Sequence, residues 1–349
     1  MYSEHFGLSG QPFQLTPDAR FWYGSRTHKK AMAYLGYGLA QGEGFIVITG
    51  EVGAGKSTLV GHLMATIDRA RLNAISIVST QIEGDDMLRL VAQGLGLASG
   101  GVEKARLLDM VERRLEEEAR SGKRTLLIVD EAQNLPFSSI EELRMLSNFQ
   151  IGGRALVQIF LLGQPEFREQ LATSERLEQL RQRVIANHHL DAMDADEVEA
   201  YLRHRLSLVG WRGRPDFAAD AFPAIHRHSG GIPRRVNQIA NRLMLFAAVE
   251  GAATIDARSV EAVVADMNAE SIQPKRAAAP AQERVLPLRS VPSHEPEARA
   301  PVSDIASERR IAALEAKVEE QEAALRRVLA MLVDWVESSA DAAYRTNAA

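Results

Sequence analysis

The sequence predicts an α/β fold in which a parallel β-sheet with helices on both faces is followed by a smaller helical lid. Short apolar runs, such as residues 45–48 and 126–129, alternate with longer stretches of helical periodicity, which is the pattern of a parallel sheet buried under helices. A glycine-rich stretch directly follows the first of these runs. The lid is expected over residues 193–268, because helical periodicity continues there without a convincing strand.

The order of these patterns divides the chain into four segments. Strands are expected at residues 44–49, 74–79, 125–130 and 156–162, and helices at residues 56–69, 84–96, 103–121 and 138–149. Breaks at residues 211–215 and 229–233 divide the lid into short helices. We expect a core of residues 1–190, a lid of residues 191–270, a Pro/Ala-rich flexible linker of residues 271–303 and a C-terminal helix of residues 304–338.

Composition excludes several classes of function. The chain has 349 residues, of which 46% are apolar, and a net charge of -5 at pH 7. A sizeable core is therefore expected, and no overall basic excess attracts the molecule to nucleic acid or anionic lipid. The absence of cysteine excludes disulfides, thiolate zinc sites and cysteine nucleophiles. Neither a signal peptide nor a run of about 18 apolar residues is present, so we expect a cytoplasmic protein without a transmembrane segment.

The glycine-rich stretch fits the phosphate-binding pattern G-x-x-x-x-G-K-[ST], and it lies between an apolar strand and an apolar-periodic helix, as that motif requires. Backbone N–H groups and the helix N-terminus can bind phosphate there. Lys56 is expected to reach the β and γ phosphates, and the Ser57 hydroxyl to ligate Mg²⁺. The motif thus predicts that Mg²⁺ is held at Ser57 and that ATP is bound by Gly50, Glu51, Val52, Gly53, Ala54, Gly55, Lys56, Ser57 and Thr58.

Two carboxylates end the apolar run at residues 126–129. Asp130 is placed to hold Mg²⁺ through its water shell, and Glu131 to orient and polarise an attacking water. An acidic pair in a strand-end turn is common by itself, but here it supplies the acidic partner that the phosphate site needs. The pair therefore predicts a nucleoside-triphosphate hydrolase.

Weaker candidates come from three further segments. Gln164 follows the strand expected at residues 156–162, where a polar side chain can sense the γ-phosphate; a turn glutamine is the simpler alternative. Arg181, Arg183 and Arg234 carry guanidinium groups that suit a transferring phosphoryl group, although both arginine segments taken alone are typical solvated charge clusters. The histidines are interpreted as solvated or interfacial and not as metal ligands; the pairs considered are His188 with His189 and His226 with His228.

Together these segments resemble the AAA+ ATPases of the ExeA/GspA type, which are associated with bacterial secretion, and their relatives in pilus biogenesis and in exosortase (XrtA)/PEP-CTERM exopolysaccharide loci. The resemblance covers roughly residues 1–268. Its most specific strings are DEAQNL and GQPE. The strings that carry it are YSEHFGL at 2–8, PF at 12–13, TPD at 16–18, the phosphate-binding loop, DEAQNL at 130–135, ELR at 142–144, GQPE at 163–166, LRQR at 180–183 and SGGIPR at 229–234.

This resemblance implies an AAA+ P-loop fold, ATP hydrolysis and a homo-oligomer such as a ring. It makes Gln164 the sensor-1 residue and Arg234 the sensor-2 arginine that reaches the nucleotide from the lid. Arg181 or Arg183 would be the finger supplied to a neighbouring subunit. ExeA-like proteins continue into a transmembrane helix and a peptidoglycan-binding region, whereas a proline-rich stretch follows here, so cell-wall binding is not carried over.

The exosortase-associated branch is the closer fit. It implies that the protein is cytoplasmic and that its partners are inner-membrane export or secretion components. A peripheral location at the inner membrane is the alternative. A DNA-associated ATPase of the transposition-helper type stays an alternative, but no obvious winged helix follows the lid, and nucleic acid is not an expected partner. A non-catalytic ATP-dependent assembly switch is the other alternative, although such a switch does not need Glu131.

Beyond the proline-rich stretch, the sequence has a heptad pattern. The residues on this seam are Ile311, Leu314, Val318, Gln321, Leu325, Val328, Leu332 and Trp335. Their alternating three- and four-residue spacing predicts a coiled-coil helix over residues 304–338 that binds itself or a partner helix. An amphipathic helix lying on the inner membrane is the alternative.

Overall fold

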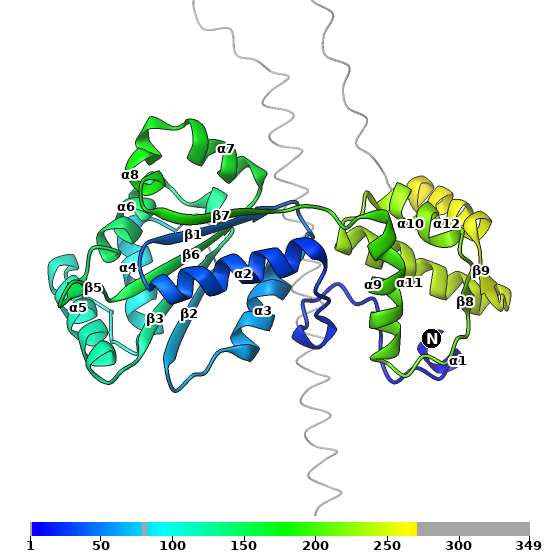
Figure 1. Cartoon of the computed structure of the whole chain (residues 1–349), viewed down its shortest axis with the longest axis horizontal. Coiled ribbons are helices and arrows are strands. Elements are labelled where there is room, and N and C mark those ends of the chain that lie inside the picture. Colours follow the sequence, from blue (N-terminus) through cyan, green and yellow to red (C-terminus); the bar gives the residue numbers. More distant parts are fainter. Residues whose placement is uncertain (1, 79–81, 271–349) are drawn as a thin grey trace, which may run out of the picture. The chain divides into compact units, whose positions relative to one another are not determined.

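The structure, a computed structural model, describes residues 2–78 and 82–270. A five-stranded parallel sheet has the strand order β2-β3-β6-β1-β7 (Figure 1). Its strands are β1 (Phe45–Gly50), β2 (Leu72–Val78), β3 (Arg124–Asp130), β6 (Val157–Gly163) and β7 (Val184–Leu190). The four expected strands are found within two residues at each end, and β7 was not predicted. The parallel sheet with helices on both faces confirms the predicted α/β fold class.

Both faces of the sheet are buried under helices. Because successive side chains of a strand point to opposite sides, neighbouring residues of one strand belong to different hydrophobic clusters. In β1, Phe45 and Val47 belong to one hydrophobic cluster, with residues of helices α4 (Gly84–Gly94), α5 (Lys104–Arg120), α6 (Phe137–Leu146) and α7 (Pro165–Thr173). Ile46 and Ile48 belong to another, with residues of helices α2 (Arg26–Gln41) and α3 (Lys56–Thr66). Figure 1 shows α2 and α3 together on one face of the sheet. This double coverage explains why the central strands are continuous apolar runs.

The helices of this region connect the parallel strands, except for α2, which precedes β1. They are α2 (Arg26–Gln41), α3 (Lys56–Thr66), α4 (Gly84–Gly94), α5 (Lys104–Arg120), α6 (Phe137–Leu146), α7 (Pro165–Thr173) and α8 (Glu178–Arg181). Single 3-10 turns lie at η1 (Ala19–Phe21), η2 (Ala132–Asn134) and η3 (Glu175–Leu177). A small hairpin of β4 (Gln150–Ile151) and β5 (Arg154–Ala155) precedes β6. The four helices expected before residue 150 are found within three residues at each end.

The lid consists of α9 (Ala195–Ser207), α10 (Ala221–Ser229), α11 (Pro233–Glu250) and α12 (Ala257–Glu270). It also contains a short parallel pair, β8 (Asp216–Phe217) with β9 (Thr254–Ile255), so the expectation of a lid without strands is wrong at this point. Strands of two residues are too short to produce a recognisable alternation of apolar and polar residues in the sequence.

The N-terminal segment, which includes α1 (Tyr2–His5), packs with the lid. Its buried residues Tyr2, Leu8, Phe13 and Phe21 join the hydrophobic cluster formed by the lid helices. The sequence had placed these residues with the core of residues 1–190. The difference has a physical cause, since well-separated apolar residues give no periodicity and their packing partners are known only from the fold.

The predicted linker of residues 271–303 and the predicted coiled-coil helix of residues 304–338 lie outside the described residues. Within residues 2–78 and 82–270, no helix is both long enough and apolar enough to cross a membrane.

Candidate functional site

The predicted phosphate-binding loop joins β1 to the N-terminus of α3. Gly53 and Gly55 have φ angles of 87° and 101°, a region that disfavours any side chain. Gly55 is the N-cap of α3, so the first N–H groups of the helix face the loop. A loop of this shape at a helix N-terminus is suited to bind an anion such as a phosphate.

Lys56 lies inside this loop and is buried. Its Nζ donates hydrogen bonds to the carbonyl oxygens of Gly50 at 2.7 Å and Glu51 at 3.2 Å. Burial lowers the pKa of Lys56, while the carboxylates of Glu131 and Asp130 counteract this change. The ammonium group therefore sits among acceptors that phosphate oxygens can replace.

Ser57 and Asp130 form the oxygen pair expected for a cation. The hydroxyl of Ser57 donates to Oδ2 of Asp130 at 3.2 Å, at the point where α3 begins and β3 ends. A hydroxyl and a carboxylate are ligands that Mg²⁺ prefers, and this ion keeps several waters and phosphate oxygens in its shell. The two side chains thus fit the metal that the fold implies.

Glu131 follows β3 in a left-handed conformation with φ 56°. Its Oε2 accepts a hydrogen bond from Nε2 of Gln164 at 3.1 Å and another from Nε2 of Gln133. Burial alone would raise the pKa of Glu131, but these two amide donors and the nearby Lys56 together lower it. The carboxylate is therefore held ionised, as a general base must be. Gln133 was not among the predicted site residues; its position in the DEAQNL string was the available signal.

The first turn of lid helix α11 lies directly on the phosphate-binding loop. The backbone N–H of Arg234 donates to the carbonyl oxygen of Gly53 at 3.1 Å. A Cβ atom added at Gly53 would lie 2.3 Å from Cβ of Arg234, so the loop needs glycine here also for this approach. The side chain of Arg234 is exposed and lines the same pocket as Lys56 and Glu131.

That pocket has a volume of ≈ 180 Å³, and three parts of the chain form most of its lining, with His28 and Glu131 added to them. The phosphate-binding loop contributes Val52, Gly53 and Gly55 to Thr58, and the lid contributes Met193, Tyr201, Arg205, Pro233, Arg234 and Asn237. The N-terminal segment contributes the third wall, with residues Gln14 to Asp18 and Phe21 to Tyr23. Phosphate-binding and aromatic groups therefore face one space, which suits a ligand with both a phosphate chain and a planar base.

The aromatic part of this wall was missed by sequence reasoning. Trp22 stacks on His62 with ring centroids 4.3 Å apart and meets the ring of His28 edge-on at 5.3 Å. The adjacent Trp22 and Tyr23 at the end of the N-terminal segment were the only sequence signal. Nothing in their spacing connects them to a loop that begins at Gly50.

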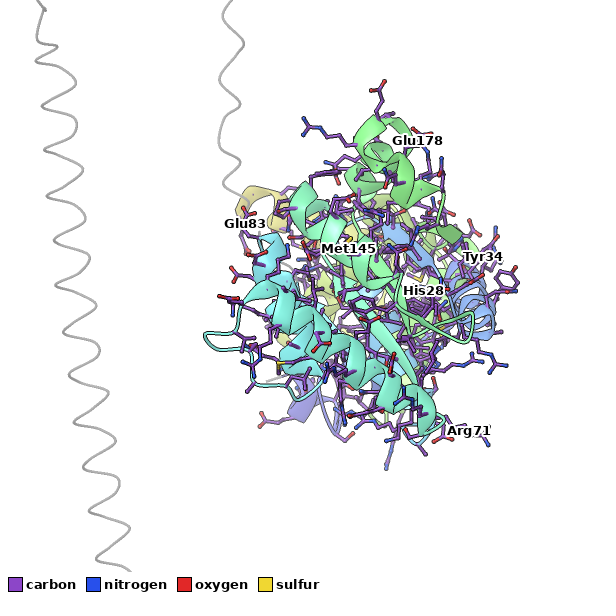
Figure 2. All side chains as sticks on the ribbon, turned by 90° about the vertical axis from the view of Figure 1, so that its left-hand side faces the viewer. His28, Tyr34, Arg71, Glu83, Met145 and Glu178 are labelled. Carbon is purple, nitrogen blue, oxygen red and sulfur yellow. The ribbon has the colours of Figure 1, made fainter. Side chains whose placement is uncertain are left out.

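The side chain of His28 packs against the phosphate-binding loop at Gly55. It is 6% exposed, its Nδ1 lies 2.6 Å from Oγ of Ser25, and a Cβ added at Gly55 would lie 2.6 Å from its Nε2. Burial lowers the pKa of His28 to about 4, so the imidazole is neutral at physiological pH. The residue is labelled, with Tyr34 of the same helix, in Figure 2.

Arg181 and Arg183, the two predicted finger residues, do not line the pocket. Arg181 is exposed, and its guanidinium donates to the carbonyl oxygens of Leu171 and Ala172 at the end of α7. Arg183 is half-buried and donates to Oγ of Ser147 at 2.9 Å. Both guanidinium groups are therefore engaged outside the pocket of their own chain.

The histidines considered as metal ligands have protein partners instead. His188 lies near the carbonyl oxygen of Thr27, and Nδ1 of His189 lies 2.9 Å from Oγ1 of Thr49. In the lid, His226 contacts the carbonyl oxygen of Met193, and His228 pairs with Glu261. In the part of the chain that the structure describes, no group of three or more His, Cys, Asp and Glu side chains is arranged to hold a metal ion.

Comparisons with known proteins agree with this geometry. Residues 39–171 match the AAA domain family. General secretion pathway protein A of Aeromonas hydrophila is 36% identical over 252 residues. This alignment covers 72% of the chain and 46% of that protein, so the chain spans about half the length of its curated relative.

Solved structures share the fold at low sequence identity. Cdc6p of Pyrobaculum aerophilum superposes with a TM-score of 0.56 at 15% identity, covering 72% of this chain and 71% of that one. The ORC1 protein of Aeropyrum pernix, solved in complex with DNA, gives a TM-score of 0.55 at 14% identity, with coverage of 74% and 69%. At these identities the likeness establishes the P-loop AAA+ fold and says nothing of a shared ligand.

Proposed function

We propose that this chain binds ATP with Mg²⁺ and hydrolyses it. The match to the AAA domain family and the identity to a secretion-pathway protein support an ExeA/GspA-like AAA+ protein. The observation that carries the proposal is the Glu131 carboxylate, which lines the same pocket as Lys56 and Ser57. A protein that only binds nucleotide needs the phosphate-binding loop but not an oriented carboxylate beside it.

The site residues divide the work by their positions. Lys56 exchanges the carbonyl oxygens of Gly50 and Glu51 for the β and γ phosphates of ATP, because the ammonium gains more from anionic oxygens. Ser57 and Asp130 would hold Mg²⁺, which neutralises charge on the phosphates when bound. Glu131 takes the proton of the attacking water, and Gln164 keeps that carboxylate in place.

The remaining predicted residues complete this scheme. Arg234 reaches phosphate from the lid as the sensor-2 arginine, since its backbone already contacts Gly53. An arginine of a neighbouring copy, Arg181 or Arg183, supplies transition-state charge in a homo-oligomer. In this scheme a core of residues 1–190 binds the nucleotide, and a lid of residues 191–270 closes over it.

The process that ATP hydrolysis drives is inferred from the similarity to general secretion pathway protein A, because the residues of the site do not indicate it. We infer that the protein energises or regulates a bacterial secretion or exopolysaccharide export assembly of the exosortase type. It would act in the cytoplasm beside inner-membrane components. The identity to a general secretion pathway protein supports the secretion part of this inference.

The proposal is tested with two variants that separate binding from chemistry. Lys56→Ala should abolish tight ATP binding, because it removes charge neutralisation of the phosphates. Glu131→Gln should retain binding and lower multiple-turnover phosphate release by about 10² to 10⁴-fold, the range of a lost general base. Binding is measured by calorimetry and turnover by phosphate release.

Matched controls for this experiment come from the surface of the same region. Lys30→Ala and Glu43→Gln remove a similar charge at exposed positions outside the pocket, so both activities should stay near those of the unmodified protein. Hydrolysis by Glu131→Gln at the unmodified rate would refute the assignment of the base. Binding without turnover in the unmodified protein would instead support an ATP-dependent assembly switch.

A further inference from the structure

The side chain of Gln133 connects the ends of two neighbouring strands beside the nucleotide pocket. Gln133 lies in turn η2, directly after β3, and its Nε2 donates to Oε2 of Glu131. Its Oε1 accepts the backbone N–H of Gln164 at 3.0 Å, after β6. One amide group therefore joins Glu131, the residue that follows β3, to Gln164, the N-cap of α7.

Gln164 closes this arrangement into a ring. Its own Nε2 donates to the same Oε2 of Glu131 at 3.1 Å. Both amide donors thus occupy one carboxylate oxygen, while Oε1 of Glu131 accepts no hydrogen bond from the described residues. The second oxygen is left to accept the proton of a water, and its direction is fixed because the carboxylate cannot rotate without breaking both bonds.

The backbone of Glu131 also needs support. Its φ of 56° is the single positive value among non-glycine residues of the described chain. A left-handed conformation costs a non-glycine residue free energy and persists only where surrounding contacts determine it. The N–H of Glu131 bonds Oδ1 of Asp130 at 2.9 Å, and Gln133 restrains the side chain. Such strained conformations concentrate at functional sites.

We propose that Gln133 is a positioning residue for ATP hydrolysis: it aims the carboxylate of Glu131 at the attacking water and couples that aim to the position of Gln164. The inference rests on the proposed function, because it assigns Gln133 a role in the same reaction. Any ligand contact that displaces Gln164 also displaces Glu131, since the amide of Gln133 bonds both residues.

The first test is Gln133→Met, which keeps the length of the side chain and removes both hydrogen bonds. We expect kcat to fall about 10-fold, as is typical when a group that orients a reacting residue is lost. The dissociation constant of ATP should stay within about two-fold, because Gln133 does not line the pocket. Asn134→Ala is the matched control, since Asn134 is the exposed neighbour in the same turn, and its kcat should be unchanged.

A second variant separates the donor from the acceptor. Gln133→Glu keeps an acceptor for the N–H of Gln164 but replaces the donor to Glu131 with a second carboxylate. It should therefore lower kcat more than Gln133→Met does, since two facing carboxylates repel each other. A residue that only fills space would rank these variants the other way, because glutamate and glutamine have nearly the same shape.

Coupling gives the third readout. Gln133 and Gln164 restrain the same oxygen, so the double variant Gln133→Met/Gln164→Met should lose less activity than the product of the two single losses. Wild-type kcat in Gln133→Met would overturn the inference, as would equal losses of kcat and ATP affinity. Failure of the proposed function is recognised separately, because the unmodified protein would then release no phosphate.

Discussion

The backbone N–H of Arg234, in the first turn of lid helix α11, donates a 3.1 Å hydrogen bond to the carbonyl oxygen of Gly53 in the phosphate-binding loop. The lid therefore contacts the loop through main-chain atoms, whereas the sequence predicted only that the side chain of Arg234 reaches the nucleotide. Because the loop carries the phosphate-binding N–H groups, a change at this contact should affect both stability and nucleotide binding.

Gly53→Ala tests this contact. The added Cβ would lie 2.3 Å from Cβ of Arg234, at a residue with φ 87°, so the lid or the loop must move. We expect a loss of about 1–2 kcal/mol in the free energy of unfolding from the backbone alone, together with weaker ATP binding. Urea unfolding and calorimetry measure the two effects.

Gly36→Ala is the matched control for that prediction. Gly36 lies in α2 with no atom within 4 Å of an added Cβ. Alanine is favoured over glycine in a helix interior by about 1 kcal/mol, so this variant should be slightly more stable. Equal ATP affinity in Gly53→Ala and Gly36→Ala would contradict a functional contact between the lid and the loop.

A second prediction concerns the contact between the starts of α2 and α9. Glu197 is buried, and its carboxylate accepts the N–H of Arg26 at 2.8 Å and that of Asp194 at 3.3 Å. Glu197→Ala leaves these N–H groups without an acceptor and should cost about 1–3 kcal/mol in the free energy of unfolding. Urea unfolding at low salt provides the measurement.

Arg26→Gln is the comparison for that variant. The guanidinium of Arg26 pairs with Asp194 and Asp196, but all three side chains are at least 60% exposed. Exposed ion pairs contribute about 0–1 kcal/mol and are screened by salt. The loss should therefore be smaller than for Glu197→Ala and should vanish in concentrated NaCl. A larger loss for Arg26→Gln would reverse this ranking.

The third prediction is that acid destabilises the protein through His28. Its pKa is lowered from 6.5 in the unfolded chain to about 4 in the fold. Between these values the unfolded state binds more protons, so stability is lost as the pH falls through this window. From pH 7 to pH 5 this group should lower the free energy of unfolding by about 2 kcal/mol.

The pH dependence of His28→Gln provides the check. This variant removes the titrating group but keeps a polar side chain near Ser25, so its stability should change less between pH 7 and pH 5. Denaturant unfolding at both values is sufficient. Identical pH profiles for the two proteins would show that another group causes the acid sensitivity.

The parts of the fold that the sequence predicted are those with a strong local pattern. The central strands β1, β3 and β6 are buried on both faces and therefore appear as apolar runs. Strand β7 pairs only with β1 and carries Asn187, His188 and His189, which an edge position tolerates. Helix α2 was missed because its buried residues are His28, Ala31, Leu35 and Gly38, of which leucine alone is strongly apolar.

The candidate site divides in the same way. Asp130 ends β3, and Lys56, Ser57 and Gln164 follow the carboxyl ends of β1 and β6. These strands are neighbours in the sheet, so the meeting of the four residues follows from the topology once the strands are assigned. The aromatic wall and His28 reach the pocket through packing between elements distant in the sequence. The hydrogen bonds of Gln133 depend on a left-handed residue, Glu131, a conformation that side-chain patterns do not reveal.

The last prediction addresses the finger arginines. Arg181 is exposed, whereas Arg183 is half-buried and bonded to Ser147, so a neighbouring copy can reach Arg181 more easily. If Arg181 completes the site of a neighbour, specific ATPase activity should rise with protein concentration, and Arg181→Ala should lower kcat by about 10³-fold. Arg176→Ala, an exposed neighbour outside the pocket, should have little effect.

Mixing two inactive variants provides the decisive measurement for that prediction. In a mixed oligomer, an Arg181→Ala subunit keeps an intact Lys56, and a Lys56→Ala subunit keeps an intact Arg181. An interface that joins the two therefore contains one complete site, since the finger acts in trans and the loop in cis. Phosphate release should rise well above the sum of the separate variants. Activity that stays at that sum, with mixed oligomers demonstrated by mass, would show that Arg181 does not act on a neighbouring site, and repeating the experiment with Arg183→Ala would test the other candidate.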